Sequence, residues 1–153
     1  MEENYFLRKA KDEDVNDVFK LSNEDYVRKY SINTTEIDWK EHKAWFENIM
    51  NSDNHIFYVV TDRTNKFLGQ LRYRVENEMA TISISLCKSI TGRGLSKTLV
   101  KNSIELISEE RYELKKIIAY VSNDNIASKK LFESIGFILQ ENKKAMLKYE
   151  YFI

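Results

Sequence analysis

Between residues 55 and 94 the chain shows three strand patterns in succession and then a turn with two glycines. This order limits the possible folds more than any other feature. The segments HIFYVVT, NKFLGQLRYRVE and MATISISLC are rich in β-branched and aromatic residues, which is typical of strands. The linkers DRT and NE between them are short, so we predict an antiparallel meander. The glycine turn TGRG then leads into an amphipathic segment, which predicts a helix of about four turns.

Hydrophobic periodicity predicts the elements on either side of this unit. The expected order along the chain is β-α-α-β-β-β-α-β-α-β-β, and residues 26–37 have no regular pattern. This order predicts a single domain over residues 1–153 in the α/β (α+β) class, with a mixed, mostly antiparallel seven-stranded sheet flanked by about four helices. The expected strands and helices outside the central unit are residues 5–9, 12–25, 38–50, 114–122, 123–137, 137–142 and 144–153.

The composition argues against several classes of protein. The 153 residues carry a net charge of zero, whereas proteins that bind nucleic acids usually have a basic excess. No apolar run approaches the roughly 18 residues of a membrane span, so no membrane partner is expected. The single cysteine, Cys87, cannot form an internal disulfide, which fits a cytoplasmic protein. We also expect no metal site, since His42, His55 and Cys87 have no ligand spacing.

The glycine turn is a candidate anion site. A turn between a strand and a helix presents unpaired backbone N–H groups at the positive end of the helix dipole. Gly92 and Gly94 let the backbone approach a ligand without a Cβ in the way, and Arg93 and Lys97 add positive charge. A Walker phosphate loop lacks its Gly-Lys-Ser/Thr ending here, and a dinucleotide fingerprint would need a third glycine at Lys97. A simple tight turn before a helix remains the alternative.

Two motifs resemble those of the GNAT superfamily of acyltransferases. TGRGLS stands where that family has Arg/Gln-x-x-Gly-x-Gly/Ala, and NDNIASKKLFESIGF is similar to its Asn-x-x-(Ala/Ser)-x-x-x-Tyr-x-x-x-Gly-Phe signature. The second match rests on Asn125, Ser128, Gly136 and Phe137, and the expected order of elements is similar over essentially the whole chain. The resemblance implies an acyltransferase that uses acetyl-CoA.

The resemblance also implies where acetyl-CoA binds. In the family, the strand before the glycine turn offers its backbone to the pantetheine arm, the turn amides hold the pyrophosphate, and an asparagine side chain contacts the pantetheine region. Thr91 and Ser96 replace the usual residues, but neither removes a backbone N–H, so we expect weaker binding and not loss of the site. The residues carried over are Ile84, Ser85 and Leu86 for the strand, Gly92, Arg93, Gly94, Leu95, Ser96 and Lys97 for the turn, and Asn125 for the side chain.

The family's catalytic side chains are incomplete in this sequence. The tyrosine often assigned as the acid that protonates the departing thiolate is Phe132 here, and Ala80 and Tyr120 occupy the places of a glutamate found in some members. The thiolate can still leave, because an alkyl thiol has a pKa of roughly 8–9. Tyr120 and Ser83 are our candidates to guide a water-mediated proton path from the amine. We expect direct attack in a ternary complex, with a non-catalytic acyl-CoA-binding module as the alternative.

The acceptor region resembles one branch of the superfamily, the N-acetyltransferases of the pseudaminic-acid and related nucleotide-sugar pathways. The resemblance implies acetylation of the 4-amino group of a UDP-linked 4-amino-4,6-dideoxy sugar. Arg28 would pair with the diphosphate, and His42 is the second candidate substrate residue. The matching residues are Val27, Arg28 and Ser31, then Glu41, His42, Trp45 and Phe46, then Gly69, Gln70, Leu71 and Arg72.

Other acceptors remain open, namely a protein N-terminal amine or a polyamine. A polyamine site should be rich in carboxylates, whereas residues 26–35 are basic and aromatic and include no carboxylate. This composition favours an anionic acceptor. The expected partner is a small-molecule amine, and the protein is expected to be a monomer or a homodimer.

Overall fold

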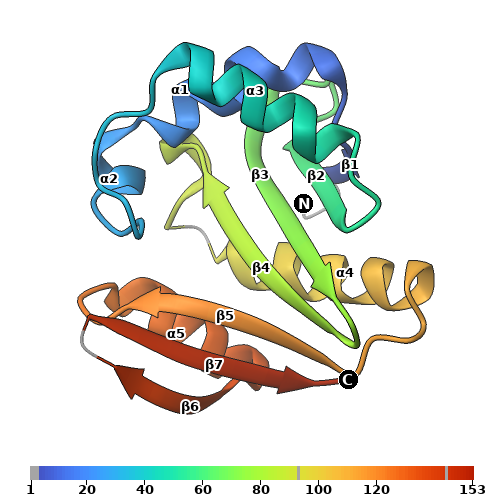
Figure 1. The fold of residues 1–153 in the computed structure, drawn as a ribbon, viewed down its shortest axis with the longest axis vertical. Helices are drawn as coiled ribbons and strands as arrows, with labels where there is room; N and C mark the ends of the chain where they lie inside the picture. The colour runs from blue at the N-terminus through green and yellow to red at the C-terminus, as the bar shows by residue number, and fades with distance from the viewer. Residues whose placement is uncertain (1–3, 93, 144) are drawn as a thin grey trace.

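The computed structural model of the protein describes residues 4–92, 94–143 and 145–153. These residues form one seven-stranded sheet in the order β1-β2-β3-β4-β5-β7-β6 and five α-helices (Figure 1). The predicted α/β class and mostly antiparallel sheet are confirmed, with five helices instead of about four. The strands are β1 (Phe6–Lys9), β2 (His55–Thr61), β3 (Phe67–Glu76), β4 (Met79–Leu86), β5 (Lys116–Ser122), β6 (Ile138–Lys143) and β7 (Met146–Phe152), and the helices are α1 (Val15–Ser22), α2 (Asp25–Arg28), α3 (Trp39–Met50), α4 (Leu95–Glu110) and α5 (Ile126–Ile135).

Strands β2, β3 and β4 form the expected antiparallel meander. Among the strand pairs of the described residues, only β4 and β5 run parallel. A parallel pair needs a crossover connection, and α4 supplies it here. The glycine turn therefore lies between the last strand of the meander and the crossover helix, as the sequence pattern predicts.

The sheet opens between β4 and β5. Their pairing runs from Met79 opposite Lys116 to Ile82 opposite Ala119. Beyond that point β4 continues with β1–β3, while β5 continues with β7 and β6 (Figure 1). The facing edges of residues 83–86 and 120–122 are therefore not paired with each other. This separation leaves backbone N–H and C=O groups available to a ligand.

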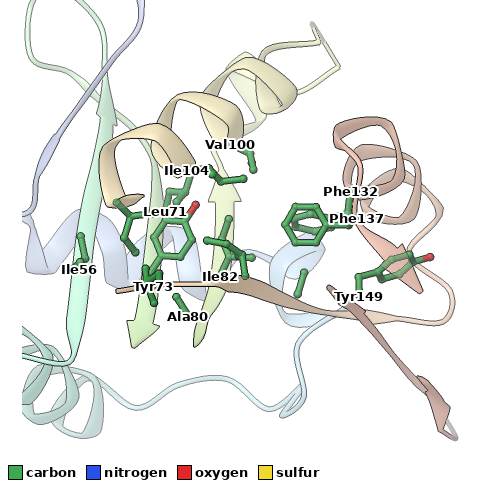
Figure 2. Close-up of a cluster of buried hydrophobic side chains, with 14 of the residues drawn as sticks. Ile56, Leu71, Tyr73, Ala80, Ile82, Val100, Ile104, Phe132, Phe137 and Tyr149 are labelled. Atoms are coloured by element: carbon green, nitrogen blue, oxygen red, sulfur yellow. The ribbon is translucent and has the colours of Figure 1, made fainter. Parts of the chain in front are cut away.

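The face of the sheet that carries α4 and α5 holds the largest hydrophobic core. Leu71 and Tyr73 on β3 are fully buried, and with Ile82 on β4 they belong to one cluster with Val100 and Ile104 on α4 (Figure 2). Full burial of an aliphatic side chain of this size stabilises a fold by about 1.5–3 kcal/mol. The core thus holds α4, and with it the glycine turn, against the sheet.

The opposite face carries α1 and α3 and includes a polar strip. Phe46 on α3 and Val18 on α1 pack together with Phe57 on β2. Because side chains alternate along a strand, the residues between those of the main core point to this face. They are Gln70, Arg72 and Arg74 on β3, and Thr81, Ser83 and Ser85 on β4, as the alternation of the sequence predicts for β4.

Helix α2 corrects one expectation, because it begins at Asp25 and runs into the segment that the sequence pattern leaves irregular. Its four residues are too few to show a hydrophobic period. Its last residue, Arg28, instead bonds to the neighbouring backbone: Nε donates to the Ser22 carbonyl and Nη1 to the Asn33 carbonyl, each at 2.7 Å. Tertiary hydrogen bonds therefore accompany a helix that periodicity does not reveal.

The predicted ends of two helices are confirmed. The Asp38 carboxylate accepts hydrogen bonds from the backbone N–H groups of Lys40 and Glu41 and begins α3. Gly136 ends α5 with a φ of 119°, a conformation that favours glycine. None of the helices in the described part of the chain has the length and apolar character needed to cross a membrane.

Candidate active site

A cleft of about 900 Å³ opens where β4 and β5 separate. Its walls come from these two strands, from α2 and the chain after it, from β3 and from the first turns of α5. Sites for small molecules usually have volumes of about 300–1,000 Å³. The predicted site residues that line this cleft are Arg28, His42, Ser83, Ile84, Ser85, Leu86, Ser96, Tyr120 and Asn125.

The glycine turn lies beside the cleft, since Thr91 before it and Ser96 after it both line the cleft wall. Gly92 has a φ of 76° and Gly94 a φ of 74°, which L side chains rarely adopt. A Cβ at either position would meet no atom within 4 Å, so conformation and not crowding requires glycine here. The turn thus keeps an open approach to the start of α4. Arg93, which belongs to the predicted set, lies outside the described residues.

The start of α4 has the chemistry that a diphosphate needs. Gly94 is the N-cap residue, and it supplies no side-chain hydrogen bond to the first turn of the helix. The first N–H groups of a helix have no intrahelical partner, and the helix dipole adds partial positive charge there. Leu95 and Lys97 are in this first turn, and Leu95 also packs on a small hydrophobic cluster that anchors it. The predicted phosphate roles of these residues stay predictions.

A tyrosine that the sequence reasoning missed contacts the strand expected to bind pantetheine. The Tyr26 hydroxyl on α2 donates a hydrogen bond of 2.6 Å to the Leu86 carbonyl on β4. Burial, mainly, raises the pKa of Tyr26 to about 12, so the hydroxyl stays protonated as a donor. The two residues are 60 positions apart in the sequence, and no local pattern signals this bond. Tyr26 thus links α2, where the acceptor is expected to bind, to β4, where acetyl-CoA is expected to bind.

Asn125 has a structural role at the start of α5. Its side-chain Oδ1 accepts a hydrogen bond of 3.1 Å from the backbone N–H of Ser128, which caps the helix. The capping bond orients the side chain at the wall of the cleft, with the amide nitrogen still able to donate. A contact between Asn125 and pantetheine stays a prediction.

The two predicted catalytic residues lie on either side of the point where the strands separate. Ser83 follows the last residue of β4 that pairs with β5, and Tyr120 follows the last residue of β5 that pairs with β4. Both line the cleft, and Tyr120 is 47% exposed. Phe132, which stands in the place of the family's tyrosine, is buried and packs on Phe137 with ring centroids 4.9 Å apart. It provides no proton donor, and the catalytic roles of Ser83 and Tyr120 stay predictions.

Arg28 uses its guanidinium group mainly to shape its own loop. Besides the bonds to Ser22 and Asn33, Nη1 lies 3.3 Å from the Thr35 carbonyl and Nη2 donates to Ser31 Oγ at 3.1 Å. Burial lowers the pKa of Arg28 below its ordinary value. A contact between Arg28 and the acceptor stays a prediction, but few of its donors are left for one.

His42 is a packed residue at the back of the cleft. It is 2% exposed, and its Nε2 lies 3.0 Å from the Val15 carbonyl, which requires the N–H on this nitrogen. Its ring lies among aromatic side chains, including Phe19 and Trp45. Burial lowers the pKa of His42, and the charge of Arg72 lowers it further. A neutral, bonded histidine fits a role in packing, so its predicted substrate contact is left without direct support.

Gln70, which is buried, and Arg72, which is partly buried, form a polar connection to which the sequence analysis assigns no role. Gln70 Nε2 lies 3.3 Å from Ser22 Oγ, and Arg72 Nη1 donates to Gln70 Oε1 at 3.0 Å. The Arg72 guanidinium lies over the Trp45 ring, 4.8 Å from its centroid. The alternation of polar residues in GQLRYR is the signal that places residues 70 and 72 on one face.

Charges in the cleft are unevenly distributed. Three arginines line it, Arg28, Arg72 and Arg74, whereas Glu41 is the only carboxylate among the lining residues that the structure describes. No group of three His, Cys, Asp or Glu side chains that could hold a metal ion occurs in the described ranges. Among the described lining residues, positively charged side chains therefore outnumber negatively charged ones.

One protein-family model matches most of the chain. The model of the acetyltransferase (GNAT) domain matches residues 4–138, from two residues before β1 to the first residue of β6. The search of curated proteins found no match.

Several solved structures share the fold. Spermidine N-acetyltransferase from Vibrio cholerae, in complex with CoA and spermine, is 17% identical with a TM-score of 0.86 over 97% of this chain and 95% of that one. A domain from Methanocaldococcus jannaschii is 22% identical, with a TM-score of 0.85 over 97% and 98%. Ribosomal-protein-S5-alanine acetyltransferase from Vibrio fischeri is 18% identical, with a TM-score of 0.78 over 97% and 93%. At these identities the likeness shows the fold alone.

The comparisons support the superfamily predicted from the motifs at residues 91–96 and 123–137. They do not support the nucleotide-sugar branch predicted from residues 27–72, because the named relatives act on spermidine or on a ribosomal protein. The family model covers nearly all the elements that build the cleft. The chain therefore belongs to the GNAT acetyltransferase family and is an N-acetyltransferase that uses acetyl-CoA as its acetyl donor.

Proposed function

We propose that the protein acetylates the primary amine of a small molecule by direct attack on acetyl-CoA in a ternary complex. The observation that carries this proposal is the separation of β4 from β5 next to the glycine turn. Ser96 at the start of α4 and residues 83–86 of β4 line the same cleft, so one continuous surface connects the start of α4 with the edge of β4. An extended thioester with a diphosphate at one end matches such a surface.

The proposed donor site uses main-chain groups. The diphosphate would accept hydrogen bonds from the amides around Gly94. The pantetheine arm would bond to the backbone of Ile84, Ser85 and Leu86, where the Leu86 carbonyl already accepts a hydrogen bond from Tyr26. The thioester would then lie near Ser83, where the strands begin to separate. A free N–H of β4 aimed at its carbonyl would stabilise the oxyanion that forms on attack.

The proposed reaction moves three protons: the ammonium loses one before attack, the nitrogen loses a second to water as the tetrahedral intermediate becomes the amide, and the thiolate gains one. An alkylammonium acceptor has a pKa of about 10 and must lose a proton before its nitrogen can attack the thioester carbon. Tyr120 and Ser83 would guide that proton into water. When the tetrahedral intermediate collapses, the C–S bond breaks and the electron pair leaves on the CoA sulfur. The Phe132 side chain has no acidic proton, so the thiolate takes its proton from water.

Two classes of acceptor are favoured by separate observations. A polyamine is favoured by the solved spermidine N-acetyltransferases that share the fold. An amine that also carries an oxyanion is favoured by the three arginines and the single described carboxylate of the cleft. The UDP-linked 4-amino sugar belongs to this second class, although no comparison supports it. We propose an amine with an oxyanion as the acceptor on the basis of the cleft's own charges.

A panel of amines tests both parts of the proposal, the transfer of acetyl to an amine and the class of the acceptor. Release of free thiol from acetyl-CoA would be measured with spermidine, a peptide with a free N-terminus and a UDP-linked 4-amino-4,6-dideoxy sugar. We expect turnover with the anionic amine and little with spermidine. Efficient turnover with spermidine would instead establish the polyamine class. Binding of acetyl-CoA without turnover on any amine would contradict catalysis and favour the acyl-CoA-binding module.

A further inference from the structure

Arg72 lines the cleft with most of its N–H donors unused by the described residues. One nitrogen, Nη1, donates to Gln70 Oε1 at 3.0 Å. Among the residues that the structure describes, Arg72 forms no ion pair with a carboxylate. The guanidinium carbon Cζ lies over the Trp45 ring, 4.8 Å from its centroid, a cation–π contact that helps to position the group. No described residue accepts from the remaining N–H groups, so they can donate to a ligand.

The other two arginines of the cleft differ from Arg72. Arg28 directs its nitrogens at backbone carbonyls and at Ser31 Oγ. The Arg74 side chain is 54% exposed and lies 3.8 Å from the Glu76 carboxylate. Arg72 is therefore the cleft arginine with the most unused hydrogen-bonding capacity.

The position of Arg72 places it near the expected site of reaction. It lies directly opposite Ser83 in the register of β3 and β4. Ser83 in turn follows the last residue of β4 that pairs with β5, and the side chains of Arg72 and Ser83 are on the face of the sheet that lines the cleft. A group bound by Arg72 would thus belong to a molecule whose amine can reach the thioester from the acceptor side.

The surroundings of Arg72 make pairing with an anion favourable. Burial, mainly, and the nearby charge of Arg28 together lower the pKa of Arg72 to about 10. Both effects show that the cation is poorly stabilised by its own protein. A planar oxyanion would bond to the guanidinium through two N–H groups and offset the lost hydration. Glu41 is the one carboxylate among the described residues of the cleft wall, and it forms no ion pair with Arg72.

We propose that Arg72 binds an oxyanion, a carboxylate or a phosphate, carried by the amine acceptor of this enzyme. This assignment deepens the function proposed above and rests on it. It makes Arg72 a specificity residue, which selects amines with an oxyanion over polyamines of similar length. The matched pairs of amines described next distinguish a carboxylate from a phosphate.

Matched pairs of amines test the assignment through kinetics. The pair β-alanine and propylamine differs by a carboxylate, and the pair O-phosphoethanolamine and ethanolamine differs by a phosphate. We expect the anionic member of at least one pair to have the higher kcat/KM. Arg72→Gln should remove that preference by raising KM about tenfold or more, with kcat little changed, because a tenfold effect corresponds to about 1.4 kcal/mol of binding. Arg72→Lys, which keeps the charge but not the planar fork, should lie between the two.

Arg74→Gln is the matched control, since Arg74 lies two residues further along the same face of β3. It should raise KM for the anionic amine by a smaller factor than Arg72→Gln does, because the Arg74 side chain is more exposed and lies beside the Glu76 carboxylate. Thermal unfolding of each variant verifies that it is folded. A KM that Arg72→Gln and Arg74→Gln change equally, or that neither changes, overturns the assignment.

Fluorescence of Trp45 gives a readout that does not require turnover. The chain has two tryptophans, so Trp39→Phe leaves Trp45, under the guanidinium, as the only one. With CoA at saturation to fill the diphosphate site, β-alanine and inorganic phosphate would be titrated separately. We expect a saturable change in emission with one of them, which Arg72→Gln abolishes and Arg74→Gln retains. No saturable change with either probe, or a change that survives in Arg72→Gln, overturns the assignment.

The two proposals fail in different ways. If spermidine is acetylated efficiently and Arg72→Gln has no effect, the acetyltransferase function stands and the role of Arg72 is wrong. If no amine in either panel is acetylated, the proposed function fails, while the titration of Trp45 still decides whether Arg72 binds oxyanions.

Discussion

At the scale of single residues, the turn before α4 depends on backbone conformation more than on side chains. Gly94 has a φ of 74° and open space where a Cβ would be. We therefore expect Gly94→Asp to weaken acetyl-CoA binding about tenfold or more, because its carboxylate would repel the diphosphate. Isothermal titration with acetyl-CoA measures the change.

Gly94→Asn is the control for Gly94→Asp. Asparagine has nearly the same shape as aspartate, and both tolerate positive φ better than other side chains do. The neutral variant should retain most of the affinity, so the difference between the two reports charge alone. Equal affinities for acetyl-CoA in the wild type and in Gly94→Asp would contradict a diphosphate site at this turn.

The lowered pKa of His42 predicts that the protein loses stability in mild acid. Burial, mainly, holds this pKa below the ordinary value of 6.5. The unfolded chain therefore binds more protons than the folded chain between these two pKa values, so the free energy of unfolding falls as the pH drops below about 6.5. Urea unfolding at about pH 7.5 and about pH 5.5 measures the loss.

His42→Gln tests the origin of this loss, since glutamine can still donate a hydrogen bond to the Val15 carbonyl. The variant should lose less stability than the wild type over the same change of pH. Some loss should remain, because burial also lowers the pKa of His55. An unchanged pH dependence in His42→Gln would show that His42 does not cause it.

At the scale of elements, the close contact of β3 with β4 positions the strand of the donor site. A Cβ on Gly69 would lie 2.7 Å from Leu86 Cδ2 and 2.8 Å from the Ser85 carbonyl oxygen. The backbone atom cannot move away without moving β4. Gly69→Ala should therefore lower the free energy of unfolding by about 1–3 kcal/mol. It should also weaken acetyl-CoA binding, since Ser85 and Leu86 belong to the proposed pantetheine strand. Urea unfolding and calorimetric titration measure the two effects.

Gly136→Ala provides the control for a glycine away from the donor strand. Its φ of 119° makes alanine strained, although a Cβ there would meet only the Tyr151 ring, at 3.5 Å. This variant should lose stability but bind acetyl-CoA as the wild type does. If Gly69→Ala loses stability with unchanged affinity, the position of β4 does not control the donor site.

At the scale of the whole molecule, the short pairing of β4 with β5 joins two parts of one sheet, β1–β4 and β5–β7, which separate beyond it (Figure 1). A donor bound between them should stabilise the fold as a whole. At about 100 times its Kd, acetyl-CoA should raise the free energy of unfolding by about 2.7 kcal/mol. Thermal unfolding with and without acetyl-CoA measures the shift.

Hydrogen exchange locates the same effect in the sheet. Amides in residues 83–86 and 120–122 should exchange more slowly with acetyl-CoA bound, whereas amides of β6 should change little. The Gly94→Asp variant at the same ligand concentration should show less protection. Protection that is confined to the first strands of the meander would place the donor elsewhere.

Local patterns in the sequence determined much of this protein. The meander of β2, β3 and β4, the glycine turn, the start of α3 at Asp38 and the end of α5 at Gly136 agree with the predictions. The physical reason is that periodicity, capping and positive φ depend on residues within a few positions of one another. The superfamily also follows from such local motifs, and the family comparison confirms it.

Tertiary structure decided what the side chains of the cleft do. Arg28 bonds to its own loop, His42 packs among aromatic rings, and Tyr26 reaches Leu86 across 60 positions of sequence. The separation of β4 from β5, on which the cleft depends, is a property of strand pairing and not of either segment. Hydrogen bonds and ring contacts between distant segments form only when the chain is folded, so no short pattern encodes which donors stay free for a substrate.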